Sequence, residues 1–477
     1  MTFESSKETV QTKSAAEALK ESLFYKKTNV WEASDAARRQ TIFDYAENYK
    51  KYLDASKTER EAVETSVAFL EKAGYRPYKW GEALSAGDKI YYVNRQKSLI
   101  ACRIGTGDPE EDGYRIAAAH IDSPRLDIKQ NPLYEDSGMC FMKTHYYGGI
   151  KKYQWTAVPL ALHGVIIRKD GTSVSVCIGE DEGEPLFYIN DLLPHLGAEQ
   201  AKQPLGSAIA GETLNLLVGG LPYPDEKIDD KIKLNVLALL HEKYGVTEED
   251  FISAELSAVP AYRARDIGFD RALIGSYGHD DRVCAYPALT ALAETEDTRH
   301  TLIVILSDKE EIGSVGNTGM QSHVFADFME AVARAFGADF ARVRNASLCL
   351  SADVCAAFDP NFAEVYERRN SAMISSGTSM AKHTGSRGKS GANDASAETV
   401  SRIRRMFANN GVVWQTAELG KVDAGGGGTV AMFIANLGIN TVDLGVPVIS
   451  MHAPYEVISK ADLYTTHEAL AAFYKED

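Results

Sequence analysis

The chain has 477 residues, of which 44% are hydrophobic and 25% are charged. This composition is typical of globular proteins, and the length predicts about two or three domains. The formal net charge of −16 argues against a surface for nucleic acid or an anionic membrane, because 67 acidic side chains would repel phosphate. No apolar run approaches the roughly 20 residues that span a bilayer, and no signal peptide is visible. We therefore expect a cytoplasmic protein with no nucleic-acid or membrane partner.

The first predicted elements are helices. Residues 13–75 carry apolar residues at helical spacing, and Ser34 or Asp35 would cap one of these helices. Short strands follow, and the last of them, over residues 114–120, is expected to be fully buried. Together these elements predict the first part of an α/β domain, residues 1–124.

The pattern changes between residues 125 and 266. Residues 158–178 alternate apolar and polar side chains around Lys169-Asp-Gly171, which is typical of an antiparallel hairpin with a tight turn. We expect an irregular polar stretch over residues 198–211 and a helix over residues 231–244. The segment is predicted to be an inserted β-rich domain.

The α/β pattern returns over residues 267–477. Residues 275–281 are expected to open a helix that continues through Leu289, and strands then alternate with helices to the end of the chain. Such alternation predicts a mainly parallel sheet flanked by helices. The fold class is therefore α/β, with one domain split in sequence by the β-rich insertion.

Metal-binding residue types stand at or near the ends of apolar runs. Buried strands are predicted over residues 114–120, 301–308, 346–353 and 445–452. His120, Glu310-Glu311, Asp353 and His452 stand at or just beyond these ends, and Asp280-Asp281 precede a helix. In open α/β sheets the carboxyl ends of the strands are where ligands bind.

These residues could hold two divalent cations. Such a site needs a bridging carboxylate and an open face, so we assign Asp280 as the bridge, His120 and His452 as imidazole ligands, and Asp353 and Glu311 as terminal carboxylates. Zinc suits this mixture of nitrogen and oxygen ligands best, although manganese or cobalt could also be bound.

Two further carboxylates have predicted catalytic roles. Asp122 lies two residues beyond His120 and is expected to orient that imidazole through its other ring nitrogen. Glu310, the neighbour of Glu311, is expected to act as the general base.

Each motif alone has a simpler interpretation. Asp280-Asp281 could only cap a helix, Asp353 could cap the next segment, and Glu310-Glu311 could be a solvated pair. A histidine at a strand end is more often structural than a ligand. It is their joint occurrence that favours a metal site.

The motifs that contain these residues also resemble those of a known family. They are His120-Ile-Asp-Ser-Pro-Arg-Leu, Tyr277-Gly-His-Asp-Asp-Arg282, Asp308-Lys-Glu-Glu-Ile-Gly-Ser314, Ser351-Ala-Asp353 and Met451-His-Ala-Pro454. In this order they resemble the motifs of the aspartyl aminopeptidases, which are co-catalytic zinc exopeptidases. The resemblance implies two metal ions, the same ligand and base assignments, and peptide substrates. It also implies a tetrahedral dodecamer assembled through the inserted domain, which would serve dimerisation.

The resemblance implies a further substrate contact. Leu192-Leu-Pro-His195-Leu resembles a motif whose histidine reaches the active site of a neighbouring subunit. His195 is therefore a candidate substrate or oxyanion contact supplied in trans. His145 and His163 lie in the same insertion, and His195 could instead be a surface residue.

A basic loop and a glycine run follow the predicted ligands. Residues 377–391 include Lys382 and His383, with Arg387 and Lys389 beyond, and these could pair with an acidic substrate side chain. A solvated loop and a broader specificity remain alternatives. Residues 424–429 contain four glycines without the Lys-Ser/Thr of a phosphate loop, so we expect close backbone approach to substrate or metal instead.

Two other functions remain open at this stage. A related two-metal deacylase or carboxypeptidase would use the same core, and a shell-forming homologue would keep the fold without catalysis. All predicted ligands and the predicted base are present, which favours an enzyme.

Overall fold

The computed structural model describes residues 14–476, and its largest element is a nine-stranded sheet. The strand order is β1 (Arg76–Pro77), β2 (Lys89–Asn94), β3 (Ser98–Arg103), β14 (Thr301–Ser307), β4 (Tyr114–His120), β15 (Leu348–Ala352), β21 (Asn440–Gly445), β17 (Thr378–Ala381) and β19 (Trp414–Thr416). The central strands β14, β4, β15 and β21 run parallel, whereas antiparallel pairs occur toward both edges. The sheet is thus mixed around a parallel centre.

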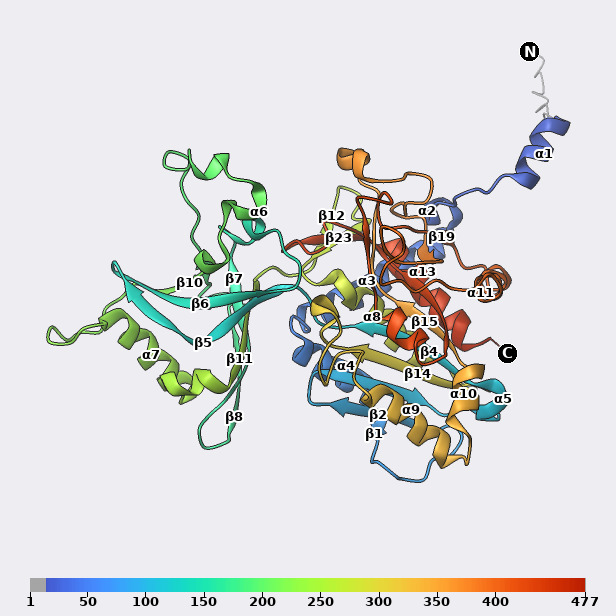
Figure 1. Ribbon diagram of the computed structural model, residues 1–477, viewed down its shortest axis with the longest axis horizontal. Coiled ribbons are helices and arrows are strands. Elements are labelled where there is room, and N and C mark those ends of the chain that lie inside the picture. The colour runs from blue at the N-terminus through green and yellow to red at the C-terminus, as the bar shows by residue number, and fades with distance from the viewer. Residues whose placement is uncertain (1–13, 477) are drawn as a thin grey trace, which may run out of the picture.

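Helices cover both faces of this sheet (Figure 1). One face packs against α3 (Ala36–Asp54), α4 (Glu59–Lys72), α8 (His279–Glu294), α11 (Ala397–Asn409) and α13 (Lys460–Tyr474). The other packs against α9 (Val324–Ala335), α10 (Phe340–Ala346) and α12 (Ala431–Ala435). Within β14, Leu302, Val304 and Leu306 face the first layer, and Ile303 and Ile305 face the second. This two-residue period explains why the strand is apolar throughout.

Local capping fixes where the first helices begin. Asp35 caps α3 by accepting the backbone N–H of Arg38, whereas Ser34 ends the short helix α2 (Val30–Ala33). Thr58 and Glu61 form a reciprocal capping box at the start of α4. Helix α1 (Ala15–Leu23) projects from the body of the molecule, and α5 (Pro109–Asp112) precedes β4. Among the described residues no helix has the length and apolar character needed to cross a membrane.

A second sheet is built entirely within residues 125–260. Its order is β8 (Ser173–Ile178), β7 (Leu160–Ile167), β11 (Ala254–Pro260), β5 (Arg125–Asp136), β6 (Met139–Tyr147), β10 (Leu216–Gly219) and β9 (Tyr188–Ile189). Every pair in it is antiparallel, and the expected hairpin is formed by β7 and β8. The sheet has its own core, to which α7 (Lys231–Tyr244) contributes Ile232 and Val236. It lies beside the nine-stranded sheet (Figure 1). Residues 198–211, expected to be irregular, contain a 3₁₀ turn over Gln200–Lys202 and the four-residue helix α6 (Leu205–Ala208).

A third sheet corrects one of the strand predictions. It contains β12 (Arg265–Ile267), β13 (Leu273–Ser276), β23 (Glu456–Ser459), β22 (Pro447–Ile449) and β16 (Cys355–Ala356), and two short strands, β18 (Gly385–Ser386) and β20 (Gly426–Gly427), pair separately. Residues 445–452 were expected to be one buried strand of the main sheet, which is wrong. The main-sheet strand ends at Gly445, and β22 pairs instead with β16 and β23. Pro447 has no N–H to donate, which disfavours continuation of the main-sheet strand.

Candidate metal centre

The predicted metal ligands converge although they come from two sheets. His120 ends β4, Asp353 follows β15, and Glu311 lies in the single 3₁₀ turn Glu310–Ile312 after β14. Asp280 lies in the first turn of α8, where its backbone is not helical, and His452 lies in the loop after β22. The carboxyl ends of the parallel strands therefore supply three ligands, and the third sheet positions the other two.

The ligand atoms form two groups that share Asp280. His120 Nε2 lies 3.1 Å from Asp280 Oδ1 and 3.6 Å from Asp353 Oδ1. His452 Nε2 lies 3.2 Å from Asp280 Oδ2 and 3.4 Å from Glu311 Oε2. One oxygen of Asp280 thus faces each group, as a bridging carboxylate must. We call these groups the His120 triad and the His452 triad.

The charges of the site favour cations. Asp280 is only 3% exposed, and its Oδ1 atom and Glu311 Oε1 are buried without a hydrogen-bond partner. Burial opposes charging of His452, but Asp280 and Glu311 outweigh it and raise its pKa to about 10. Carboxylates that are buried without compensation are costly, and divalent cations would provide that compensation. The residues present therefore fit a pair of divalent cations, and the imidazole and carboxylate donors suit zinc.

Asp122 connects the His120 triad to the turn that carries Glu310 and Glu311. Its backbone carbonyl accepts from His120 Nδ1 at 3.1 Å, and its Oδ1 lies 3.3 Å from the same nitrogen. Its carboxylate also accepts the backbone N–H groups of Glu310 at 3.1 Å and of Glu311 at 3.2 Å. These contacts leave His120 Nε2 free to face Asp280. Asp122 is thus placed to position other groups rather than to contact substrate.

Glu310 faces the cavity beside the two triads. Burial is the main cause that raises its pKa to about 8, and the carboxylates of Asp353 and Asp280 add to the effect. A carboxyl group whose pKa lies near neutrality can both accept and return a proton. Its neighbour Glu311 belongs to the His452 triad, and ligand atoms of both glutamates also lie within 4.8 Å of a ring nitrogen of His120.

Two buried carboxylates at the site had no role assigned from the sequence. Glu456 accepts the backbone N–H of Asp280 at 3.1 Å and that of His452 at 2.7 Å. Asp281 accepts the backbone N–H of His120 at 3.3 Å. Glu456 begins β23 four residues after His452, and that spacing from a predicted ligand was the available signal.

A cavity of about 350 Å³ opens next to the triads. The glycine run lines it from Gly425 to Thr429. The Asp443 carboxylate, on β21, also lines it and accepts from Thr429 Oγ1 at 2.6 Å and from Asn393 Nδ2 at 2.8 Å. Burial raises the pKa of Asp443 to about 7. This carboxyl group thus links the glycine run to the loop that carries Asn393, and parts of both segments line the cavity.

The predicted substrate-binding residues are not all at the cavity. His383 lines it, together with Arg387 and Lys389. Lys382 does not line it, and its Nζ atom donates to Asp394 Oδ1 at 2.7 Å and to the carbonyl of Ala395 at 2.9 Å. Lys389, which does line the cavity, donates to the other oxygen of Asp394 at 2.9 Å.

The histidines of residues 125–266 that the sequence singled out lie outside this cavity. His195 is exposed in a turn between β9 and α6, and His145 is exposed on β6. His163 is buried between Glu61, whose Oε1 lies 2.7 Å from Nδ1, and Glu180, whose Oε1 lies 3.0 Å from Nε2. Within one chain, none of the three lines the described cavity.

Comparisons with known proteins identify the family. The family model described as aminopeptidase I zinc metalloprotease (M18) matches residues 52–474. A probable M18 family aminopeptidase 1 of Clostridium acetobutylicum is 49% identical over 453 residues, covering 93% of this chain and 97% of the relative. An M18-family aminopeptidase from Thermotoga maritima has a crystal structure that matches with a TM-score of 0.91 at 41% identity, covering 95% of this chain and 100% of that chain.

A more distant likeness concerns the fold alone. The yeast mApe1 dodecamer matches with a TM-score of 0.73 at 20% identity, covering 91% of this chain and 97% of that chain. The family match and the two close relatives carry more weight, because they span almost the entire chain at high identity. The chain therefore belongs to the M18 family of aminopeptidase I zinc metalloproteases, which includes the aspartyl aminopeptidases, and is a zinc-dependent aminopeptidase.

Proposed function

We propose that the chain releases amino-terminal residues from peptides with two metal ions held by the His120 and His452 triads. The observation that carries the proposal is Asp280, which presents one carboxylate oxygen to the imidazole of each triad. Zinc suits these donors, and manganese or cobalt could also be bound. When bound, two such ions polarise the scissile carbonyl and lower the pKa of an attacking water.

Glu310 and Asp122 have separate roles in the proposed reaction. Glu310 takes the proton of the attacking water and returns it to the leaving amine, which its place at the cavity beside both triads supports. Asp122 accepts hydrogen bonds from His120 Nδ1 and from the backbone N–H of Glu310. It therefore fixes the position of the base relative to one metal ligand.

Acidic amino-terminal residues are the proposed preferred substrates. His383, Arg387 and Lys389 line the cavity and could pair with a substrate carboxylate. Lys382 would act indirectly in this proposal, through the Asp394 carboxylate that it shares with Lys389. Similar kcat/KM values for Asp, Leu and Lys aminoacyl substrates would contradict the preference.

We also propose that residues 125–266 form an inserted oligomerisation domain between the two parts of the catalytic domain, residues 1–124 and 267–477. The separate core of the seven-stranded sheet supports this division. A tetrahedral dodecamer is the proposed assembly, with His195 reaching a neighbouring subunit's cavity in trans, and its exposure in one subunit is compatible with that role. A cytoplasmic location stays a prediction from the sequence.

Replacement of the base tests the mechanism. Glu310→Gln keeps the shape of the side chain but cannot take a proton, so kcat should fall about 10³-fold while metal content stays unchanged. The matched control is Glu364→Gln, at an exposed position, which should behave like the wild type. Metal content by elemental analysis and kcat on an aminoacyl substrate are the readouts. If Glu310→Gln keeps full activity, the assigned base is wrong.

Blocked substrates separate the proposal from its alternative. A deacylase or carboxypeptidase with a related two-metal core would hydrolyse amino-terminally acetylated peptides, whereas an aminopeptidase needs the free amine. We expect hydrolysis of the free peptide and none of its acetylated form. The reverse result would favour the alternative.

A further inference from the structure

The end of strand β6 in the seven-stranded sheet lies against both metal-binding triads. Tyr147 is the last residue of that strand, and Gly148 and Gly149 follow it. The Tyr147 hydroxyl donates to Asp122 Oδ2 at 2.7 Å. The Gly149 carbonyl lies 2.7 Å from His452 Nδ1. Three consecutive residues of the inserted segment thus reach groups that come from opposite ends of the catalytic part of the chain.

Tyr147 acts on the carboxylate that orients the His120 triad. Asp122 Oδ2 accepts both the Tyr147 hydroxyl and the backbone N–H of Glu311. Burial and the charge of Asp122 raise the pKa of Tyr147 well above its ordinary value, so the hydroxyl remains a donor. Because the same carboxylate faces His120 Nδ1, a shift of Asp122 would move the imidazole as well.

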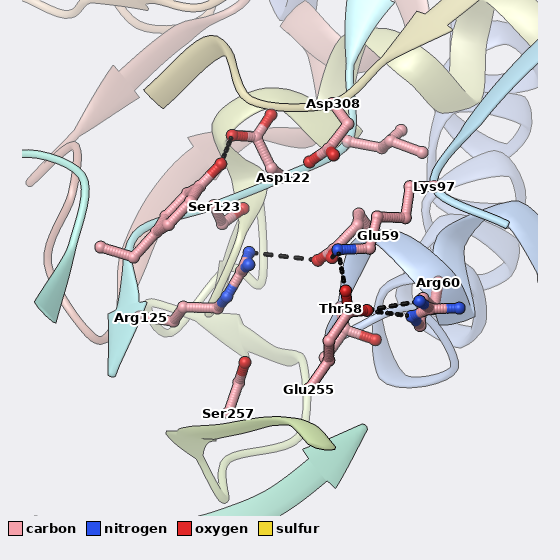
Figure 2. A network of polar contacts seen from close by, with 12 residues as sticks. Thr58, Glu59, Arg60, Lys97, Asp122, Ser123, Arg125, Glu255, Ser257 and Asp308 are labelled. Atoms are coloured by element: carbon pink, nitrogen blue, oxygen red, sulfur yellow. Dashed lines mark hydrogen bonds and ion pairs between the residues drawn. The ribbon is translucent and has the colours of Figure 1, made fainter. Parts of the chain in front are cut away.

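The Tyr147 ring is itself held in place by Arg125. The guanidinium carbon of Arg125 lies 4.0 Å from the ring centroid. Arg125 Nη1 lies 3.1 Å from Glu59 Oε2, at the start of α4, and Figure 2 shows Arg125 reaching toward Glu59 below Asp122. Lys97 joins this network, with Nζ 3.6 Å from Glu59 and 2.9 Å from Glu255 on β11. Charged contacts between α4 and the seven-stranded sheet therefore hold Arg125 against the ring that donates to Asp122.

Gly148 and Gly149 make the corresponding contacts with the His452 triad. Gly148 has a φ of +75°, and a Cβ atom there would lie 3.2 Å from Glu311 Oε2 and 3.3 Å from Glu311 Cβ. Both the backbone conformation and the close approach therefore favour glycine. The Gly149 carbonyl accepts the proton of His452 Nδ1, which leaves Nε2 directed at Asp280 and Glu311. A hydrogen bond of this kind fixes the tautomer and orientation of a metal ligand.

We propose that Tyr147, Gly148 and Gly149 form a positioning segment through which the inserted sheet sets the metal affinity and the turnover of its own subunit's active site. The inference rests on the two-metal function proposed above. It gives the inserted sheet a role within one subunit, separate from the contact in trans that His195 would make. None of the three residues touches the reacting atoms, so each acts through Asp122, Glu311 or His452.

Removal of one hydroxyl group tests the proposal in the zinc-loaded enzyme. Tyr147→Phe keeps the ring against Arg125 and removes only the donor to Asp122. We expect zinc affinity, measured by competition with a chelator, to fall about 10-fold, because loss of a group that orients a ligand typically has this effect. We expect kcat to fall about 10-fold with KM within about twofold of the wild type, since Tyr147 does not face substrate. Tyr146→Phe, on the same strand and 43% exposed, is the matched control and should behave like the wild type.

A backbone variant tests the second triad. Gly148→Ala adds one methyl group against Glu311. We expect the affinity for one of the two zinc ions to fall about 100-fold relative to the wild type. If this variant fails to fold, Tyr147→Phe still decides the question. Thermal unfolding of each variant shows whether a change in activity reflects a general loss of structure.

The outcomes separate this inference from the proposed function. Wild-type zinc affinity and kcat in Tyr147→Phe would overturn the inference and leave the two-metal function intact. A lower melting temperature with unchanged zinc affinity and kcat would also overturn it, because the role would then be structural. A wild-type enzyme that binds no pair of metal ions would overturn both.

Discussion

The carboxylate of Glu456 accepts the backbone N–H of His452 at 2.7 Å. Its other oxygen accepts the backbone N–H of Asp280 at 3.1 Å, so one buried side chain braces the bridging residue and a terminal ligand. In both contacts Glu456 binds the backbone of the ligand residue, so the side chains of His452 and Asp280 stay available for a metal ion. Glu456 thus sets the spacing of the backbone on which the His452 triad is built.

Glu456→Gln is expected to weaken the metal pair. The amide of Gln has one acceptor oxygen, so its NH₂ group would face one of the two backbone N–H groups without a favourable contact. We expect zinc affinity to fall about 10-fold and kcat to fall with it. Chelator competition and steady-state kinetics are the measurements. Equal zinc affinities in the variant and the wild type would show that the brace is dispensable.

Removal of the metal ions is expected to lower stability as well as activity. Asp280 and Glu311 carry buried oxygens without hydrogen-bond partners, and the ions would compensate their charge. Ions that bind only the folded state stabilise it by about 2.7 kcal/mol at a free concentration 100 times the dissociation constant. A chelator should therefore lower the melting temperature, and added zinc should restore it. An unchanged melting temperature after complete metal removal would contradict this.

His383 and Lys382 are adjacent, but their expected effects on substrate binding differ. His383 lines the cavity, whereas Lys382 is occupied by Asp394. We expect His383→Ala to raise KM about 10-fold for an acidic amino-terminal residue, and Lys382→Ala to change it less than about twofold, because only His383 could contact that residue directly. Equal changes in KM for the two variants would contradict the prediction, because both residues, or neither of them, would then contact the substrate.

Asp266 is expected to stabilise the fold at all but very acidic pH. Its Oδ1 atom lies 2.8 Å from Nζ of the fully buried Lys460 and 2.8 Å from Nζ of Lys50. Burial opposes ionisation of Asp266, but the two ammonium groups outweigh it and lower its pKa to about 2. Because the folded pKa is below the unfolded value of about 3.9, the stabilisation is present above that value and is lost as pH falls toward 2.

Asp266→Asn should lower the free energy of unfolding by about 3 kcal/mol at neutral pH, because it removes the nearest carboxylate from the buried Lys460 and leaves Glu47, 3.6 Å away. Urea unfolding between pH 3 and 7 is the measurement, and the difference from the wild type should shrink toward the acidic end. Asp229→Asn, in an exposed loop, is the control. A pH-independent difference would show that charge is not the cause.

His163 is expected to link α4 to the seven-stranded sheet as a cation. Burial opposes its protonation, but the Cys177 side chain and the carboxylates of Glu180 and Glu61 together outweigh burial and raise its pKa to about 11. Since the folded pKa exceeds the unfolded value of about 6.5, the stabilisation is complete below that value and is lost as pH rises through 11. His163→Gln should cost about 3 kcal/mol at neutral pH, and His145→Gln, exposed on the same sheet, should cost little. Equal losses in both variants would contradict the assignment.

Local sequence patterns predicted where several of the proposed ligands stand in the fold. His120 and Asp353 stand at the ends of β4 and β15, where a buried apolar run changes to a polar residue. Helix α7 was expected over residues 231–244 and is found over Lys231–Tyr244. Patterns of this kind depend only on neighbours in the chain, so they can be read without the fold.

Contacts between distant segments could not be predicted in this way. Gly149 and His452 meet only because the loop after β6 lies against the loop after β22, and neither loop has a pattern that shows it. Tyr147 is one of 23 tyrosines, and nothing in its local sequence distinguishes it from Tyr146 beside it. The departure of the chain from the main sheet after Gly445 was missed for the same reason, since the alternative partners β16 and β23 are set by the tertiary fold.

The order of the two triads along the chain has a consequence for biosynthesis. The residues of the His120 triad are all present once Asp353 has been synthesised, but the His452 triad lacks its imidazole until nearly the whole chain has left the ribosome. Domains form from the amino-terminal end during synthesis, at about 5–20 residues per second. Asp280 is braced by Glu456, and strand β13 before it pairs with β23, so we expect neither triad to be positioned before these carboxyl-terminal residues have been synthesised. We therefore expect peptidase activity only when translation is almost complete, and a chain truncated before His452 should not hydrolyse peptides.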